Sequence, residues 1–554
     1  MSEKKNVVVV GAGFSGIFGA KKIAKKLKNN KDYQVVVVDK HSFMTYMTEL
    51  HEVAAERVMP DHVQEDLREW FHKTPNVKVV TAEVTKVDAK KKIITTNQGE
   101  IPYEKLLVAT GGESNDFGTP GVKEYGYELW SFEQALAIRE HLREVITDAS
   151  LEADPVKREE MLNIMIVGSG FTGVELVGEL IEWREVIAKE TKLNPDDIKL
   201  TMLEAAPTIL NMLTDRNLAD KAERYMTDHG VTIQKGAQVT GVTENSVLFK
   251  DGSSLPTRSL IWTAGVKNKS LLGKWGLKYE EGRGGRVKVD ENMRVIGFDD
   301  IYAAGDAVEW VDPVAGPTPQ TVQGGESMVT AAAANIVNEI KGKPLVKFKR
   351  VDWGYAVSIG SHYTVAALFG HFNFGGFFAN LVKHGINLFY FMQIKAGGSI
   401  IKYLNDEIFR MENGREPFFG MVSRRGNVLW TLLLRIAVGV AFINAGVGNS
   451  MNVPTFTGNA SADFVSVIIG LGVLAGLFGA PLAALGFLVT LIFGFVNGFT
   501  LTSVLLSFAS LALANGVSYS FGLDHWVMRF AKKTWKNFWY GEKQISYDEL
   551  DSDK

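Results

Sequence analysis

A glycine-rich turn after a run of valines constrains the N-terminal fold more than any other feature of the chain. The stretch VVVVGAGFSGIFGA (residues 7–20) places Gly11, Gly13 and Gly16 as G-x-G-x-x-G between a short buried strand and an apolar helix. Gly11 permits the tight turn, Gly13 lets the backbone approach a pyrophosphate, and Gly16 allows the helix to pack closely on the strand. The next strand, QVVVVD, ends in Asp39, where an acid binds the ribose of a dinucleotide. These residues predict a Rossmann-like dinucleotide-binding domain.

The same pattern occurs a second time, beginning at Asn163. The stretch NIMIVGSGFTGVELVGELIEW contains Gly168, Gly170 and Gly173, and the strand that follows, KLTMLE, ends in Glu204. A carboxylate at this position accepts the ribose 2′-hydroxyls and repels a 2′-phosphate, and the next residues, AAP, include no Lys or Arg. NADH is therefore favoured over NADPH. Two fingerprints predict two dinucleotides, one retained as a cofactor and one exchanged.

Two further turns follow buried strands. The strand KLLVA opens into Thr110 and Gly111, and IYAA opens into Gly305 and Asp306. Each has a purely structural explanation, because the first suits any strand-end turn and Asp306 suits a helix N-cap. In a flavoprotein with two dinucleotides, however, the first turn lies against the cofactor. An acid at the second turn suits the hydroxyls of a flavin ribityl chain, and we favour this interpretation for both turns.

Glu175 follows the second fingerprint on the helix that begins there. One interpretation is a first-turn carboxylate that interacts favourably with the helix dipole. The other is an acid that faces the contact between nicotinamide and flavin. Further along, the strand SLIWTAGV ends at Ala264 and Gly265, which are small enough to admit a flat ring. These residues are candidates for the place where the two rings meet.

Together these motifs resemble the type II NADH dehydrogenases, which are single-chain NADH:quinone oxidoreductases that do not pump protons. The resemblance covers about residues 5–400 and rests on GAGFSG, LHEVAA, ATGG, GSGFTGVELVGEL, LEAAP, WTAGV, AAGDAV, GES and VDWGYAVSIGSH. It implies an α/β fold of two dinucleotide-binding, Rossmann-like domains, the second inserted in the first. It also implies that FAD lies on the first fingerprint and NADH on the second.

The resemblance implies contacts for each ligand. For FAD they are Gly11, Gly13, Phe14, Ser15, Gly16, Asp39, Lys40, Val84, Thr110, Gly111, Gly305, Asp306 and Gln323. For NADH they are Gly168, Gly170, Phe171, Thr172, Gly173, Glu175, Glu204, Ala264 and Gly265. Glu175 and Gln323 are the expected catalytic residues.

The segment expected to bind quinone departs from the family pattern. The family carries a sequence resembling A-Q-x-x-x-Q before G-E-S, and its glutamines line the quinone pocket. Here the segment is PTPQTVQGGES, so Gln323 matches the second glutamine and Pro319 replaces the first. Gln320 is displaced by one residue, which is about 100° of rotation on a helix. Alternatively, Pro319 at the helix start shifts the register. Pro319, Gln320 and Gln323 are therefore the quinone candidates, while a soluble protein, oxygen or an extracellular route stays open as the acceptor.

Composition excludes several related activities. The chain contains no cysteine, so disulfide reductase and sulfide:quinone oxidoreductase chemistry, iron–sulfur clusters and redox-active dithiols are excluded. The formal net charge of -3 argues against nucleic acid as a partner. We expect no metal site, and a homodimer is compatible with the sequence.

The C-terminal part has the composition of a membrane domain. Between Arg435 and Asp524 the only charged residue is Asp463, and the apolar runs predict four helices that form a transmembrane bundle. Basic residues flank the bundle at both ends, which places both ends and the flavoprotein domains on the cytoplasmic side of the cell membrane, with a multi-pass topology. The segments LLLRIAVGVAFINAGVGNSM and VSYSFGLDHW resemble the DoxX-like family of four-helix membrane proteins. In an alternative interpretation the bundle is an assembly or export module and the flavoprotein is its redox sensor.

The remaining predictions concern the approach to the membrane and the organisation of the whole chain. The stretch Phe377–Leu404 is expected to form an amphipathic helix at the bilayer surface, with His384 as an ordinary surface residue. Arg435 either snorkels to the cytoplasmic face or forms a polar site with Asp463 or a quinone head group. The expected organisation is an FAD-binding domain in two parts (1–160 and 286–350), an NADH-binding domain (161–285), a membrane-associating segment (351–424), a bundle (425–520) and a cytoplasmic tail (521–554).

Overall fold

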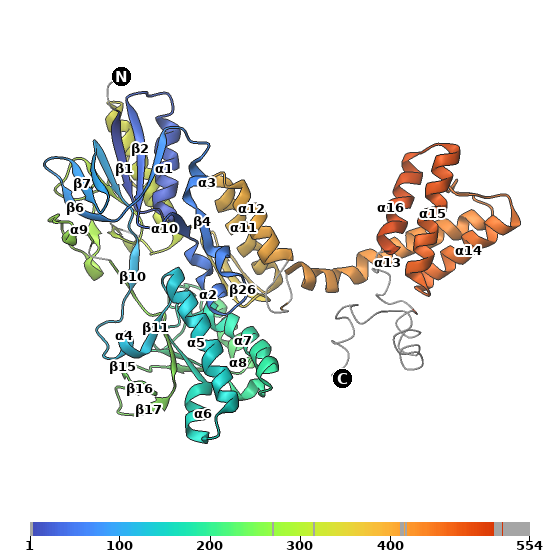
Figure 1. Cartoon of the computed structure of the whole chain (residues 1–554), viewed down its shortest axis with the longest axis horizontal. Coiled ribbons are helices and arrows are strands. Elements are labelled where there is room, and N and C mark those ends of the chain that lie inside the picture. Colours follow the sequence, from blue (N-terminus) through green and yellow to red (C-terminus); the bar gives the residue numbers. More distant parts are fainter. Residues whose placement is uncertain are drawn as a thin grey trace. The chain divides into compact units, whose positions relative to one another are not determined.

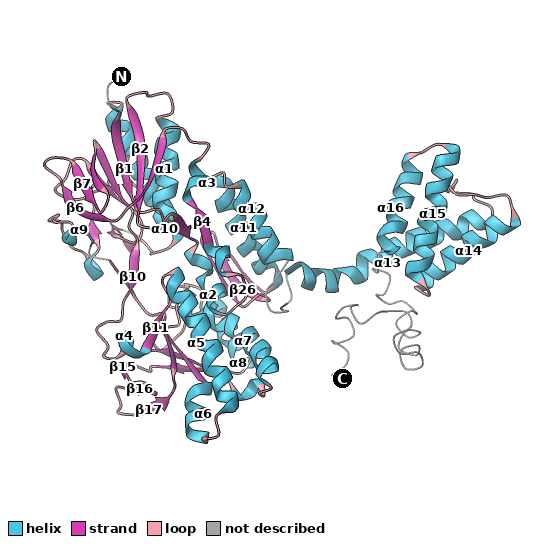
Figure 2. Cartoon of the chain, viewed as in Figure 1, coloured by secondary structure: helices cyan, strands magenta, loops and turns pink. Residues whose placement is uncertain are grey.

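The computed structural model describes residues 4–268, 271–313, 316–409, 415, 418–514 and 523. The chain forms two compact units, Met1–Phe418 and Phe419–Lys554, and each is described by itself (Figure 1). The first unit mixes strands and helices, whereas the described part of the second is helical (Figure 2). Of the predicted cytoplasmic tail, only Leu523 lies within the described residues.

The first fingerprint lies in a five-stranded parallel sheet. Its valines are buried, and the pairs Val7–Val35 and Val10–Val38 lie side by side in the central strands. The strand order is β21 (Ile301–Ala303), β9 (Lys105–Val108), β1 (Lys5–Val10), β2 (Tyr33–Asp39) and β5 (Val77–Thr81). Helices α1 (Phe14–Lys26) and α10 (Val322–Ile340) pack together against this sheet. Because β21 follows the whole second domain in sequence yet pairs with β9, the predicted insertion is confirmed.

The second fingerprint lies in a second parallel sheet of the same kind. Its order is β11 (Gly126–Glu128), β18 (Ser259–Trp262), β12 (Asn163–Val167), β13 (Lys199–Glu204) and β14 (Val231–Lys235). The accompanying helices are α5 (Phe132–Leu151), α6 (Pro155–Leu162), α7 (Phe171–Thr191) and α8 (Arg216–Asp228). The edge strand β11 precedes the boundary predicted at residue 160.

Small antiparallel sheets and short elements complete the first unit. Residues 76–97 alternate apolar and polar side chains, a pattern typical of an antiparallel layer. However, β5 pairs with β2 in the parallel sheet, and only the later strands form such a layer. The three-stranded sheets are β6 (Val84–Asp88), β7 (Ile93–Thr96) and β8 (Gly99–Pro102); β15 (Val239–Val242), β16 (Ser246–Phe249) and β17 (Ser254–Pro256); and β25 (Gly354–Ile359), β26 (Tyr363–Leu368) and β27 (Phe372–Gly375). The short elements include η1 (Met47–Glu49), α2 (Leu50–Ala54), η2 (Pro60–Val63) and α3 (Leu67–Phe71).

The amphipathic stretch before the second unit is helical, as predicted, but its polar residues face inward. It forms α11 (Phe377–Gln393) and α12 (Gly397–Tyr403), and Phe378 and Leu381 lie exposed on the outer side. The prediction that His384 lies at the surface is wrong. Its ring is buried, and Nδ1 lies 2.8 Å from the Tyr403 hydroxyl because α11 turns this face toward the core of the first unit.

The described part of the second unit contains four helices, α13 (Phe418–Gly446), α14 (Ala460–Ala475), α15 (Gly479–Asn497) and α16 (Leu501–Ala514). Among the described residues, only α15 is both long and apolar enough to cross a membrane, while Leu432–Gly446, α14 and α16 are shorter apolar helices. The four helices within the described residues agree in number with the prediction, but the one span candidate among them does not support a multi-pass topology. The topology was predicted from basic residues that flank the bundle: Arg424 and Arg425 before it, and Arg529, Lys532, Lys533 and Lys536 after it. The described residues include only the backbone of the first two and none of the last four.

Arg435 has a structural partner inside the bundle. Its side chain is buried, and Nε and Nη2 donate hydrogen bonds to the carbonyls of Val473 and Leu474, each at 3.1 Å. These carbonyls belong to the last turn of α14, where the helix dipole favours a cation. Arg435 thus caps a neighbouring helix instead of snorkelling to a surface. Asp463 lies at the other end of α14 and accepts a hydrogen bond from the Gly458 N–H at 3.1 Å.

Candidate active site

The two glycine loops have the same backbone geometry. Gly11 and Gly168 adopt φ values of +97° and +102°, which L side chains rarely adopt. A Cβ at Gly16 would lie 1.8 Å from the Gly11 carbonyl oxygen, and a Cβ at Gly173 would lie 2.0 Å from the Gly168 carbonyl oxygen. The first and third glycines of each fingerprint are therefore required by the fold itself.

The middle glycine of each fingerprint faces open space. A Cβ at Gly13 or at Gly170 would meet no atom within 4 Å. Each of these glycines is the residue immediately before its helix, α1 or α7, where the first backbone N–H groups are free to bind an anion. Both loops thus have the shape and the donors that a dinucleotide pyrophosphate needs.

The acids that end the second strands hold the loops in the same way. Asp39 Oδ2 accepts a hydrogen bond from the Ala12 N–H at 2.6 Å, and Glu204 Oε2 accepts one from the Ser169 N–H at 2.9 Å. In both cases the donor lies between the first two glycines of the fingerprint. Each carboxylate oxygen has more than one acceptor site, so both acids can still bind ribose hydroxyls. The structure brings each predicted acid to its predicted loop.

The turns predicted to face the flavin contain an unpaired polar group and open space beside the backbone. The Thr110 hydroxyl is buried and has no hydrogen-bond partner, and a Cβ at Gly111 would meet nothing within 4 Å. Gly305 has φ +81°, and a Cβ there would lie 2.7 Å from the Ser15 hydroxyl. Asp306 is half-buried at the same turn. An unpaired buried hydroxyl beside open backbone fits a large polar cofactor such as FAD.

The remaining residues predicted to contact FAD have mixed environments. The Phe14 ring packs against Tyr390, with 5.0 Å between the ring centroids. Lys40 is exposed. Val84 is buried, and its carbonyl accepts a hydrogen bond from the Trp275 indole N–H at 2.8 Å.

The expected nicotinamide side contains aromatic and small residues. The Phe171 ring lies 5.1 Å from the Tyr355 ring, and Thr172 beside it is half-buried. Gly265 has φ +75°, and a Cβ there would lie 2.4 Å from the Phe117 ring. Ala264 is half-buried, and its carbonyl accepts a hydrogen bond from the Trp262 indole at 3.0 Å.

Glu175 lies in the second turn of α7, because the helix begins at Phe171. The interpretation as a first-turn carboxylate is therefore wrong. Burial raises the pKa of Glu175 to about 8, and Lys383 only partly offsets this effect. The carboxyl group is consequently protonated at neutral pH, so it can donate a hydrogen bond to a ligand.

In the acceptor segment the two glutamines have different environments, but the expected helical rotation does not apply because Gln320 precedes the helix. Helix α10 begins at Val322 after an N-cap at Thr321, so Pro319 precedes the helix. Pro319 and Gln323 line a small pocket together with Arg350, Val351, Asp352 and Tyr355. Gln320 instead donates a hydrogen bond from Nε2 to the Asp306 carbonyl at 3.3 Å. Only one of the two glutamines therefore lies at this pocket.

Comparison with known proteins identifies the family. The family described as pyridine nucleotide-disulphide oxidoreductase matches residues 5–334. A type II NADH:quinone oxidoreductase from Staphylococcus haemolyticus is 30% identical over 374 residues, which are 66% of this chain and 90% of that protein. The chain belongs to the type II NADH:quinone oxidoreductases.

Further relatives agree with this assignment. The type II NADH:quinone oxidoreductase of Staphylococcus aureus is 29% identical over 374 residues, again 66% of this chain and 90% of that protein. The structure of NDH2 from Plasmodium falciparum in complex with NADH shares the fold, with a TM-score of 0.62 at 18% identity, over 72% of this chain and 98% of that chain. As a type II NADH:quinone oxidoreductase, the protein is a flavin-dependent oxidoreductase that uses FAD and NADH.

The first unit of this type II NADH:quinone oxidoreductase contains a buried charge network that the sequence did not reveal. The network joins helices α2, α7 and α11. Arg57 Nη1 lies 2.9 Å from Glu179 on α7 and 3.2 Å from Glu52 on α2, and Lys383 Nζ on α11 lies 2.6 Å from Glu52. Burial alone would raise the pKa of Glu52, but Arg57 and Lys383 hold it well below its usual range. The only local signal was the presence of charges in otherwise apolar helices, such as Lys383 in NLVKHGINLF.

Proposed function

We propose that the chain is a membrane-bound flavoenzyme that oxidises NADH through FAD and reduces a membrane quinone without pumping protons. The observation that carries this proposal is the pair of fingerprint loops, each held by a strand-end acid, within one compact unit. One loop would hold the resident cofactor and the other the exchanging nucleotide. This arrangement suits a reaction in which electrons pass between two bound dinucleotides.

The first loop and its turns would hold FAD. Gly11 and Gly13 would receive the pyrophosphate, Asp39 the ribose, and Asp306 the ribityl hydroxyls, while the unpaired Thr110 hydroxyl would gain a partner. FAD accepts two electrons from NADH and releases them to an acceptor, which the protein side chains cannot do. The role of the chain is to bind, orient and shield.

The second loop would hold NADH. Its pyrophosphate would lie over Gly168 and Gly170, and Glu204 would accept the 2′-hydroxyl, so the enzyme should prefer NADH to NADPH. Protonated Glu175, one turn along the helix, would face the nicotinamide side and donate a hydrogen bond there. The reaction would consume NADH, one solvent proton and quinone, and yield NAD⁺ and quinol.

The pocket beside Gln323 is our candidate for the quinone entrance. Gln323 donates a hydrogen bond from Nε2 to the Val351 carbonyl at 3.3 Å, which holds its amide at the pocket edge. Because Gln320 is turned to Asp306 and Pro319 takes its place, the pocket is less polar than the family pattern implies. This difference supports, as a second candidate, an acceptor other than a membrane quinone.

The second unit would anchor the enzyme in the membrane as a DoxX-like bundle. Apolar side chains cover its outside, while hydroxyl groups lie inside, as expected for helices in lipid. In the described part of the bundle the buried polar side chains are hydroxyls and Arg435, with no buried acid to relay protons. The proposal that the enzyme does not pump rests on this interior. The cytoplasmic orientation and the four crossings rest on the flanking basic residues and the apolar runs.

The decisive experiment is steady-state NADH oxidation by the purified protein, with menaquinone, ubiquinone and oxygen compared. A quinone should support a much higher kcat/KM than oxygen does. In stopped-flow measurements, Gln323→Ala should slow flavin reoxidation by quinone and leave flavin reduction by NADH unchanged. If flavin reduction by NADH is slower and reoxidation by quinone is normal, our assignment of Gln323 to the quinone half-reaction is wrong. Equal rates with every acceptor would favour the second candidate.

A further inference from the structure

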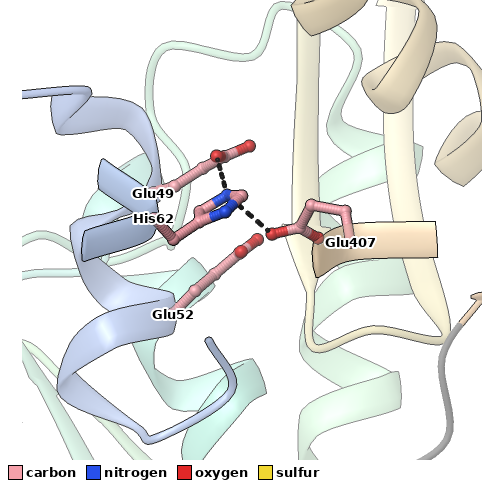
Figure 3. Close-up of side chains that lie close together, drawn as sticks. All are labelled: Glu49, Glu52, His62 and Glu407. Atoms are coloured by element: carbon pink, nitrogen blue, oxygen red, sulfur yellow. Dashed lines mark hydrogen bonds and ion pairs between the residues drawn. The ribbon is translucent and has the colours of Figure 1, made fainter. Parts of the chain in front are cut away.

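Four buried side chains converge at one point of the first unit (Figure 3). Glu49 ends η1, Glu52 lies on α2, His62 lies on η2, and Glu407 lies on η5 (Leu404–Phe409). None is more than 4% exposed, and one ligand atom from each lies within 4.8 Å of the others. A segment just before the second unit thus meets three elements near the N-terminus.

His62 is oriented as a metal ligand is. Its Nδ1 lies 3.0 Å from Asp406 Oδ2, while Nε2 lies 3.1 Å from Glu49 Oε2 and 3.3 Å from Glu407 Oε1. Metal-binding histidines commonly donate their far ring N–H to a carboxylate, which fixes the tautomer. Metal bonds of about 2.0–2.2 Å on a tetrahedral ion separate neighbouring ligand atoms by roughly 3.3 Å, which is close to the spacing around Nε2.

A buried carboxylate oxygen in the cluster lacks an N–H donor. Glu52 Oε2 accepts no hydrogen bond from a nitrogen, the Glu52 and Glu407 carboxyl groups interact with each other, and Glu407 Oε1 also contacts His62. Both side chains are fully buried. Leaving a buried charged oxygen unsatisfied costs on the order of 1–3 kcal/mol or more, so native structures pair such atoms with a donor or an ion.

The carboxylates around the cluster outnumber the permanent cations in contact with them by two. The carboxylates are Glu49, Glu52, Glu407 and Asp406, and the permanent cations in contact with them are Arg57 and Lys383. Neighbouring Glu179 is balanced by Arg415, whose Nη1 lies 3.0 Å away. A divalent cation would balance this excess, and so would two protons, one on His62 and one between Glu52 and Glu407.

We propose that Glu49, Glu52, His62 and Glu407 bind one divalent transition-metal ion, with Asp406 orienting His62. A set of three carboxylates and one imidazole suits Mn²⁺, Fe²⁺ or Zn²⁺ better than Ca²⁺, which prefers oxygen ligands alone. The ion joins η5 to η1, α2 and η2, and so fastens the segment that leads to the second unit. Its role is structural, and it does not depend on the proposed electron acceptor.

The test uses the full-length, FAD-loaded protein in detergent, first treated with a chelator and then titrated with Mn²⁺. We expect one Mn²⁺ per chain by electron paramagnetic resonance and calorimetry, and a melting temperature that rises with the Mn²⁺ concentration. Binding should release protons into a weakly buffered solution, because the ion displaces those that balance the cluster. Zn²⁺ should compete with Mn²⁺ for the same site.

Variants locate the site. His62→Ala and Glu407→Gln should remove Mn²⁺ binding, and Asp406→Asn should weaken it by about 10- to 100-fold. Glu182→Gln is the matched control, because Glu182 also pairs with a histidine, His362, but lies outside the cluster. Asp406 is 24% exposed, so its variant should fold even where His62→Ala does not, and bound FAD absorbance reports folding.

Two results would overturn the proposal. One is the absence of saturable Mn²⁺ or Zn²⁺ binding by the wild-type protein, with no proton release, which would mean that two protons balance the cluster. The other is Mn²⁺ affinity that Asp406→Asn and Glu407→Gln leave at the level of the Glu182→Gln control.

Discussion

The two units of this protein distribute polar groups in opposite ways. The first unit packs valines and other apolar side chains in its core and buries charges only where they pair, as Arg57 does with Glu52, Glu179 and Glu407. The described part of the second unit places hydroxyl groups such as Thr490 and Ser507 inside and large apolar residues outside. The difference is the one expected if the second unit lies in lipid, as proposed above, since lipid supplies no hydrogen bonds and water supplies many.

The contrast also explains why each unit uses a different kind of polar contact. In the first unit, ion pairs join elements that belong to different domains, so removing one partner leaves buried charge. In the second unit, hydroxyl pairs such as Ser507 Oγ to Thr490 Oγ1, at 2.8 Å, join neighbouring helices without charge. The predictions below test this contrast, beginning with the largest expected effect.

Removing Arg57 should have the largest effect. Arg57→Met leaves Glu52, Glu179 and Glu407 without their shared cation, and breaking a buried ion network in this way costs about 3–5 kcal/mol. We expect a large fall in the melting temperature measured by the release of FAD fluorescence. Unfolding of the bundle, followed by circular dichroism in detergent, should change little. An unaltered FAD-release temperature would mean that the network contributes no stability.

A matched pair of arginine substitutions should separate the two surfaces. Leu488 on α15 is 49% exposed and Leu151 at the end of α5 is 82% exposed. Leu488→Arg should cost about 2.5–3.5 kcal/mol in membrane insertion, because a charge at the middle of a span is poorly solvated. Leu151→Arg should change stability by no more than about 0.5 kcal/mol. The amount of each variant in the membrane fraction is the measurement, and equal amounts would contradict a lipid-facing α15.

Acid should destabilise the first unit through Glu182. Burial alone would raise the pKa of Glu182, but the hydrogen bond with His362 lowers it to about 2. A lowered carboxyl pKa contributes stability above its unfolded value of about 4.5, and this stability is lost as the pH falls toward 2. We expect a loss of roughly 2–3 kcal/mol in that range.

The control for this effect is Glu182→Gln, which cannot titrate. The loss of stability between pH 4.5 and 2 should be smaller in this variant than in the wild type by the same amount. The described interior of the bundle contains no buried acid, so its unfolding should depend little on pH over this range. Equal pH dependence of both proteins would show that Glu182 does not contribute.

The smallest effect should come from the hydroxyl pair in the bundle. Ser507→Ala removes the donor to Thr490, and hydrogen bonds between helices in membranes contribute about 0.6 kcal/mol. Unfolding of the purified protein in mixed micelles can resolve a change of this size. A loss above about 2 kcal/mol would show that the pair does more than join α15 to α16.

The sequence predicted the parts of the site that depend on local pattern. Both glycine loops, Asp39 and Glu204 were predicted because each fingerprint, its strand and its acid lie within about 40 residues. The departure at Gln320 was also local, since it follows from the substitution of Pro319 for the first glutamine of the family pattern. These features need no knowledge of which distant segments meet.

The charge network could not be predicted in the same way. Arg57 pairs with Glu179 and Glu407, which lie 122 and 350 residues away along the chain. His384 was misplaced for a related reason, because hydrophobic patterning shows that α11 has two faces but not that the flavoprotein core covers the polar one. In the bundle, hydropathy predicted four helices, but their lengths depend on loop geometry that composition does not encode.

The contact made by Arg435 constrains how the chain is synthesised. The carbonyls that it binds lie 38 and 39 residues later, so they leave the ribosome well after the arginine does. In the proposed membrane anchor, the buried guanidinium and these carbonyls can meet only after both α13 and α14 have been made, so the two helices would enter the bilayer as a hairpin.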